Sequence, residues 1–172
     1  LDAMAQAFDL SRVSKSSPIH DEDRLRWWGN KAIKKKDPRW VAEKLIEMAK
    51  DSGLQFVCTN ESLVSLIPEA ISNQATLAEL FESLNWLLMR PKKPETQPEW
   101  LRDLVNELHS LKEWKKDEIE KLLRAFQKRH GLKARDFFHP LRIYITGAHS
   151  GPPLPLTMEV LGKDEVLFRL QD

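Results

Sequence analysis

The sequence has 172 residues, of which 41% are hydrophobic and 31% are charged, and its formal net charge is +1. This composition indicates a globular chain with a charged surface and excludes a disordered tail. No apolar run approaches the ~20 residues that a membrane-spanning helix needs, and no export signal opens the chain. The length allows one core or two small helical subdomains.

A single cysteine, Cys58, cannot form an internal disulfide, and this predicts a protein of the reducing cytoplasm. We expect its thiol to be a buried structural group, as cysteines commonly are. The chain begins with Leu1 and not with methionine, so we expect it to be a fragment of a longer protein.

Apolar residues recur at helical spacing along most of the chain, and helix start signals divide it. Asp37 before Pro38 predicts a helix that ends near Gly53. A second helix is predicted after Thr59, with a break or kink at Pro68. No segment alternates apolar and polar residues for long enough to require a sheet. We therefore predict an all-α fold, with a short strand near the N-terminus as the alternative.

Two pairs of residues have the spacing of a capping box, in which a threonine precedes a glutamate by three positions. Thr76 with Glu79 predicts one helix start, and Thr96 with Glu99 predicts another. Between them, residues 90–98 include three prolines and no large apolar group. This segment is predicted to be an exposed linker.

The helix predicted from about Asp117 to His130 has a basic face opposite its apolar face. Positive charge continues beyond it with only Asp136 in opposition, and the cations are Lys121, Arg124, Lys128, Arg129, Lys133, Arg135 and Arg142. Such a density of cations favours a phosphate backbone, because binding releases condensed counterions. The alternative is an ordinary solvated helix face.

A second, weaker basic cluster adjoins two tryptophans, Trp27 and Trp28. Its members are Lys31, Lys34, Lys35 and Lys36. Aromatic rings beside cations can contact nucleic acid. We favour the simpler interpretation, in which the two tryptophans belong to the core and the lysines are solvated.

The C-terminal part carries a series of short motifs at fixed spacing. They are Gly-Leu-Lys at 131–133, Pro-Leu-Arg at 140–142, Thr-Gly at 146–147, Gly-Pro-Pro-Leu at 151–154 and Leu-Gly-Lys at 161–163. This series resembles the C-terminal signature of bacterial-type glutamyl-tRNA synthetases. Residues 8–16, followed by Asp23, Leu25, Trp27 and Asn30, are similar to the segment after the ATP-handling loop of that family. The resemblance is strong at both ends and weak between Lys31 and Pro98.

The resemblance implies three parts: a remnant of the connecting, stem-contact domain at 1–30 and two helical anticodon-binding subdomains at 31–115 and 116–172. It implies that the chain reads the anticodon loop of glutamate tRNA as part of a glutamate-tRNA ligase. The ATP- and Mg-dependent chemistry would belong to a separate catalytic domain. The alternative function is a helical protein-interaction scaffold that does not bind RNA.

No catalytic residue, cofactor or metal site is expected in this chain. Residues 13–17 superficially resemble the ATP-binding signature loop, but their position in the resemblance places them after that loop. The acidic run at 20–23 lacks a second pair of ligands at metal-binding spacing. We expect a monomer that binds tRNA and does not associate with membranes.

Arg142 is the first candidate for base recognition, because its guanidinium is a planar fork of donors. The resemblance implies that it contacts anticodon bases, and the alternative is an ion pair with a neighbouring carboxylate. Pro152 lies in a loop that its prolines stiffen, so little ordering cost is expected on binding. The resemblance also implies that Leu154 packs against a base and that Arg124 and His139 lie near the middle base.

Asn73 departs from the pattern of the family. Family members that accept only glutamate tRNA tend to place an arginine at the matching position. The Asn73 amide cannot supply a charged bidentate fork. This substitution motivates the hypothesis of relaxed discrimination, with glutamine tRNA as an additional partner.

Overall fold

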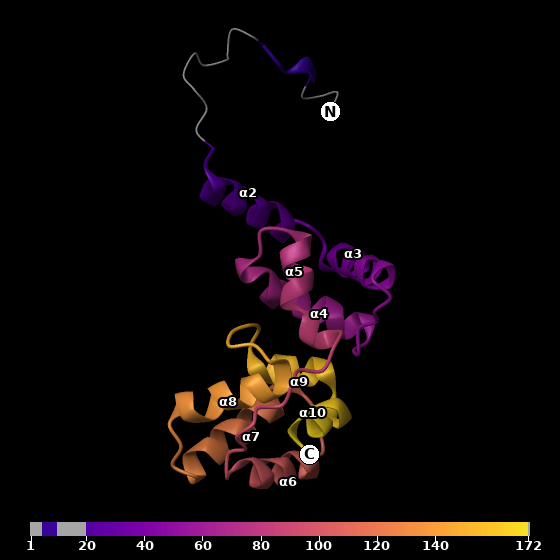
Figure 1. Cartoon of the computed structure of the whole chain (residues 1–172). Coiled ribbons are helices and arrows are strands. Elements are labelled where there is room, and N and C mark those ends of the chain that lie inside the picture. The colour runs from indigo at the N-terminus through magenta and orange to yellow at the C-terminus, as the bar shows by residue number, and fades with distance from the viewer. Residues whose placement is uncertain (1–4, 10–19, 172) are drawn as a thin grey trace.

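The computed structural model describes residues 5–9 and 20–171, and every regular element within these ranges is helical (Figure 1). The all-α prediction is confirmed for this part of the chain, which contains no strand. Residues 13–17 lie outside it. The elements are α2 (Glu22–Lys34), α3 (Pro38–Asp51), α4 (Asn60–Ala70), η2 (Ile71–Asn73), α5 (Leu77–Ser83), η3 (Asn85–Leu87), α6 (Leu101–Ser110), α7 (Lys116–Arg129), α8 (Ala134–Thr146), α9 (Leu154–Leu161) and α10 (Lys163–Leu170).

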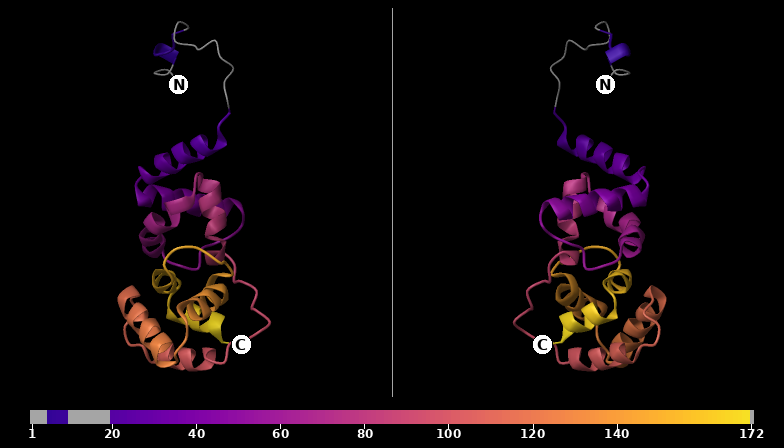
Figure 2. Two further views of the ribbon diagram at one scale, coloured as in Figure 1. Left: turned by 90° about the vertical axis from the view of Figure 1, so that its left-hand side faces the viewer. Right: turned by 90° about the vertical axis from the view of Figure 1, so that its right-hand side faces the viewer.

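The helices form two groups, with α2 to α5 above and α6 to α10 below in Figures 1 and 2. Helix α4 packs on α9 where the groups meet, and buried apolar residues of both groups form one continuous core. Helix α6 packs on α7 and α10 and so lies in the lower group, although the predicted boundary at residue 115 assigned it to the first subdomain. None of the described helices is long and apolar enough to cross a membrane.

Three of the predicted helix starts are confirmed. The side chain of Asp37 accepts a hydrogen bond from the Arg39 amide at 2.7 Å, at the start of α3. Thr59 and Thr76 each accept one from the amide three residues ahead, at 3.2 and 3.1 Å, at the starts of α4 and α5. Each bond satisfies an N–H that has no partner within the first helical turn and stabilises the helix by about 1 kcal/mol.

The capping box predicted at Thr96 and Glu99 does not form. Helix α6 begins later, at Leu101, and no side chain caps it. A box at Thr96 would require a helical conformation for the residue before Pro98, which the proline ring disfavours by steric clash. The Thr96 carbonyl instead accepts a hydrogen bond from the Tyr144 hydroxyl at 3.0 Å, which ties the linker to α8.

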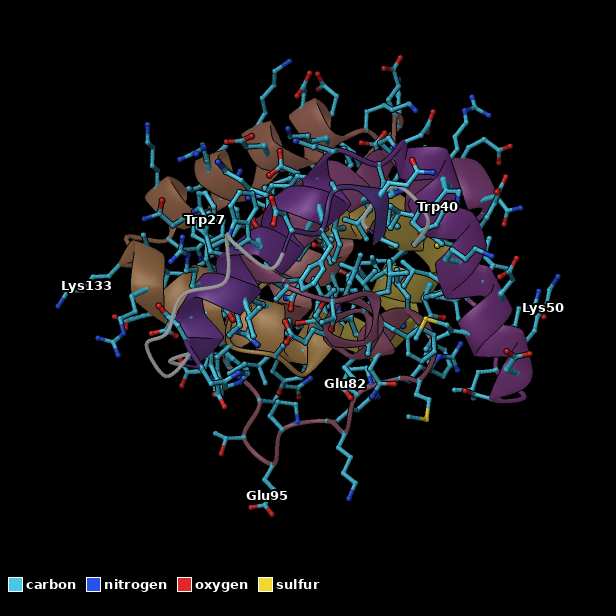
Figure 3. The ribbon with its side chains drawn as sticks, turned by 90° about the horizontal axis from the view of Figure 1, so that it is seen from above. Trp27, Trp40, Lys50, Glu82, Glu95 and Lys133 are labelled. Atoms are coloured by element: carbon cyan, nitrogen blue, oxygen red, sulfur yellow. The ribbon has the colours of Figure 1, made fainter. Side chains whose placement is uncertain are left out.

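The linker is exposed along most of its length, as predicted. It passes from the upper group to the lower group on the outside of the molecule (Figure 2). The side chain of Glu95 points away from the helices at its outer edge (Figure 3). Besides the bond at Thr96, a hydrogen bond from Lys93 to the carbonyl of Gln171 holds the linker against the end of α10.

Candidate nucleic-acid interface

A cleft of about 720 Å³ lies where the two helix groups meet. One wall comes from η2, η3 and the turns beside them, and the other comes from the end of α8 and the loop that follows it. The linker contributes to the rim. Polar groups on these segments include those of Ser72, Asn73, Gln74, Asn85, Lys92 and Ser150.

The charge of the cleft lining favours bases over phosphates. Glu69 and Glu82 contribute carboxylates, and Lys92 is the one cation among the lining residues. The remaining polar groups are mostly amides and hydroxyls, which donate to and accept from the edges of bases. Since two carboxylates oppose one ammonium, the lining does not attract a phosphate strongly.

The turn that leaves α8 fixes the second wall of the cleft. Gly147 ends the helix with φ +70°, and its amide donates to the Ile143 carbonyl at 2.8 Å. A Cβ at this glycine would lie 2.8 Å from the Cβ of Pro91, so both the backbone conformation and the linker require glycine. The Thr146 hydroxyl donates to the Arg142 carbonyl at 2.9 Å and accepts from the Ala148 amide at 3.2 Å.

Arg142 and Pro152 are in direct contact. The Nη1 atom of Arg142 donates to the Pro152 carbonyl at 2.9 Å, and a Cβ at Gly151 would lie 3.4 Å from the same Nη1 atom. Within the described ranges no carboxylate pairs with Arg142, so the predicted alternative of an ion pair is not found. Burial lowers the pKa of Arg142, yet arginine stays protonated at neutral pH. Arg142 is half-buried, does not itself line the cleft, and makes no other side-chain hydrogen bond to the described residues.

Asn73 lies on the opposite wall from Pro152. Helix α4 runs through Pro68 and ends at Ala70, and the chain then tightens into η2, whose last residue is Asn73. The side chain is exposed and has no hydrogen-bond partner among the residues that the structure describes. The structure therefore brings Asn73 and Pro152 together in the lining of one cleft, and the guanidinium of Arg142 binds the Pro152 carbonyl without itself lining the cleft.

The other three predicted site residues lie elsewhere. Leu154 is 4% exposed and packs in the core at the start of α9, so a base cannot reach it in this conformation. Arg124 is on the outer face of α7 and pairs with Glu120 at 2.7 Å. His139 is exposed, and its Nε2 lies 3.2 Å from Nδ1 of His149, outside the cleft lining.

Acidic neighbours partly neutralise the predicted basic face of α7. Lys121 pairs with Glu118 at 2.6 Å, and Arg129 pairs with Glu107 at the same distance. Exposed ion pairs of this kind contribute only about 0–1 kcal/mol, so a phosphate can compete for the cations. Lys133 projects freely from the end of this region (Figure 3).

The prediction that Trp27 and Trp28 belong to the core is wrong. They are 50% and 54% exposed, their rings meet edge to face at 4.8 Å, and Nζ of Lys31 lies 3.9 Å from the centroid of Trp27. Helix α2 packs on η2 along a single face that includes Gly29 and Asn30. The tryptophans lie off that face, where no described helix covers them.

Several cleft residues carry no signal in the sequence. Gln74 and Ser150 are polar residues outside the regular elements, Asn85 is the first residue of η3, and no motif marks any of them. Only the meeting of distant segments brings them together. Throughout residues 5–9 and 20–171, no group of His, Cys, Asp and Glu side chains could hold a metal ion.

Comparison with known protein families assigns the chain. Residues 40–172 match the family model of the anticodon binding domain. The chain belongs to this family. The matched region of the anticodon-binding domain includes both walls of the cleft, and α2 precedes it.

The relatives of this anticodon-binding domain include glutamate-tRNA ligases. The one from Bacillus licheniformis is 34% identical over 97% of this chain and 37% of its own length. The one from Staphylococcus saprophyticus is 33% identical over 95% of this chain and 37% of its own length. The chain thus spans about 37% of the length of these relatives. The resemblance to glutamyl-tRNA synthetases predicted from the sequence is confirmed.

Solved structures show the same fold. The glutamate tRNA ligase from Elizabethkingia meningosepticum superposes with a TM-score of 0.78 at 18% identity, over 98% of this chain and 35% of that chain. Glutamate-tRNA synthetase from Elizabethkingia anophelis gives 0.76 at 19% identity, over 98% and 34%.

Proposed function

We propose that this anticodon-binding domain holds the anticodon loop of glutamate tRNA in the cleft between its two helix groups. The observation that carries the proposal is the contact of Arg142 with Pro152 at one wall, opposite Asn73 on the other, in a chain of the anticodon-binding family. The cleft volume of about 720 Å³ falls within the range of about 300–1,000 Å³ that is typical of ligand pockets.

The mechanism follows from the chemistry of the two walls. Bases of a single-stranded loop can be splayed out and read on their edges, and the amides of Asn73 and Gln74 provide both donors and acceptors. The guanidinium of Arg142 is held by the Pro152 carbonyl and presents its remaining donors to a base. Phosphates of the same RNA would lie outside the cleft, where Lys128 and Lys133 are exposed.

The proposal also covers the longer protein that the glutamate-tRNA ligase relatives represent. We propose that the chain serves a glutamate-tRNA ligase, in which a separate catalytic part uses ATP and Mg and this part supplies no cofactor site. Asn73 supports a second substrate, glutamine tRNA, because a neutral amide discriminates less strictly than a charged fork. We also propose a cytoplasmic, monomeric protein.

A binding experiment tests the proposed function. A hairpin RNA with the anticodon arm of glutamate tRNA should shift the protein in a gel, and affinity should fall steeply as salt rises. Arg142→Ala should weaken binding roughly 5- to 100-fold, on the scale of one base contact. The matched control is Arg102→Ala, an exposed arginine of α6 away from the cleft.

Two results would contradict the proposal. A protein-interaction scaffold would not bind the hairpin at any salt concentration. Binding that Arg142→Ala and Arg102→Ala weaken equally would show that the cationic surface binds RNA without using the cleft.

A further inference from the structure

Helix α2 is clamped onto the wall of the cleft that carries Asn73. The side-chain amide of Asn30 donates to the carbonyl oxygens of Ile71 at 2.9 Å and Gln74 at 2.7 Å. It also lies 3.4 Å from the Ser72 carbonyl. Two N–H groups thus bind two carbonyls that flank Asn73 on either side. The segment 71–74 has only one tight helical turn of its own, so these bonds are a main restraint on its shape.

Neighbouring residues of α2 strengthen the same clamp. The Nζ atom of Lys34 donates to the Ser72 carbonyl at 3.2 Å. Arg26 binds both carboxylate oxygens of Glu79 at 2.5 and 3.0 Å, and Glu79 accepts from the Ala75 amide at 2.8 Å. These contacts reach the segment at Ser72, between the two carbonyls that Asn30 binds, and at Ala75, directly after them.

The close approach of α2 depends on a glycine. A Cβ on Gly29 would lie 2.4 Å from the Ala75 carbonyl oxygen, which is closer than real Cβ contacts come. The missing side chain lets α2 lie directly on the backbone of the segment. The adjacent Asn30 is thereby brought within hydrogen-bond reach of the Ile71 and Gln74 carbonyls.

We propose that Asn30 is a positioning residue for base recognition, which sets where the Asn73 amide lies in the cleft. The inference rests on the proposed function and deepens it. Asn30 itself does not line the cleft, and it acts through the backbone of 71–74. Without its two bonds, the segment can shift and the Asn73 side chain loses a fixed position relative to Arg142 across the cleft.

The first test measures the restraint without RNA. Asn30→Ala removes both N–H donors. Asn30→Asp keeps nearly the same shape, but its carboxylate oxygens cannot donate to the two carbonyls. Amide hydrogen exchange at Gln74 and Ala75 should accelerate at least about tenfold in both variants while the core of α3 stays protected. The matched control is Asn106→Ala at an exposed asparagine of α6. It should change neither the exchange at Gln74 and Ala75 nor the protection of α3. Unchanged exchange in Asn30→Ala overturns the proposal.

The second test asks whether Asn30 and Asn73 act as one unit. Asn73→Ala should weaken binding of the anticodon-arm hairpin about fivefold in the wild-type background, the scale of one neutral hydrogen bond. In the Asn30→Ala background it should have no further effect, because the amide is already misplaced. If the affinity loss of the double variant equals the product of the two single-variant losses, the proposal is overturned. A merely destabilised fold would lower all affinities and leave the Asn73→Ala ratio unchanged.

The two tests separate this inference from the proposed function. If the wild-type protein does not bind the hairpin, the proposed function fails, and hydrogen exchange still shows whether Asn30 restrains the segment. If the hairpin binds and the double variant is additive, only the positioning role fails.

Discussion

Arg169 and Glu165 form an ion pair of 2.8 Å within α10, and other hydrogen bonds of Arg169 tie this helix to both helix groups. The Arg169 guanidinium also donates to the Ile145 carbonyl at 2.6 Å and to the Trp86 carbonyl at 2.9 Å. Trp86 belongs to η3 in the upper group, and Ile145 belongs to α8 in the lower group. One buried guanidinium therefore fixes the distance between the segments that form the cleft.

Replacing Arg169 should strongly destabilise the fold. The residue is 3% exposed, and Arg169→Ala would leave two buried carbonyls without a donor. Loss of one partner of a buried ion pair costs about 3–5 kcal/mol. Urea unfolding followed by circular dichroism measures the change, with the exposed Arg102→Ala as control. A loss under about 1 kcal/mol would show that water replaces the guanidinium at no great cost.

Stability should fall in acid through Glu165. Hydrogen bonds from Arg90, at 2.9 and 2.7 Å, hold the pKa of this carboxyl below its ordinary value, and Arg169 adds to the effect against burial. A lowered folded-state pKa gives stability that is present above the unfolded pKa of about 4.3 and is lost as pH falls through the folded one. The free energy of unfolding of Glu165→Gln, measured from pH 7 to pH 3, should depend less on pH than that of the wild type. Glu95→Gln, on the exposed linker, should leave the slope unchanged.

The helices with strong local signals were predictable, and the arrangement of the cleft was not. Caps at Asp37, Thr59 and Thr76 act within one turn, so sequence alone locates them. The false start at Thr96 has the spacing of a capping box, but the proline two residues later excludes it. The exposure of Trp27 depends on which face of α2 meets a neighbour, and this is a property of the tertiary fold.

The predicted site residues also divide into those that the structure places at the cleft and those that it places elsewhere. The resemblance singled out Arg142, Pro152 and Asn73, and the structure places Pro152 and Asn73 in the lining of one cleft, with Arg142 bound to the Pro152 carbonyl. Leu154 and Arg124 came from the same resemblance, but one lies in the core and the other on the outer face of α7. Residue spacing identifies which side chains share a helix face, whereas only tertiary packing decides whether that face lines a cleft.

Gly147→Ala should destabilise the protein more than Gly131→Ala does. Both glycines have positive φ, at +70° and +60°, so each alanine incurs about 1–2 kcal/mol of backbone strain. A Cβ at Gly131 meets nothing within 4 Å, whereas one at Gly147 lies 2.8 Å from the Pro91 Cβ. Overpacking adds about 1–3 kcal/mol at Gly147 unless the linker moves. Equal losses in urea unfolding would mean that the linker yields freely at Pro91.

Cys58 should be a poor nucleophile in the folded protein. The thiol is partly buried beside the core, and burial raises its pKa to about 11. At pH 8.5 about half of unfolded thiols are ionised, against roughly 0.3% of a group with that pKa, so alkylation should be about 100-fold slower in the native state. Iodoacetamide labelling followed by mass spectrometry, with and without urea, gives the two rates. Because the pKa of the thiol is higher in the folded state, the unfolded chain loses its proton first as pH rises above about 8.5. The free energy of unfolding therefore falls from about pH 8.5 upward. Native labelling as fast as unfolded labelling would show that the segment around Cys58 opens readily to solvent.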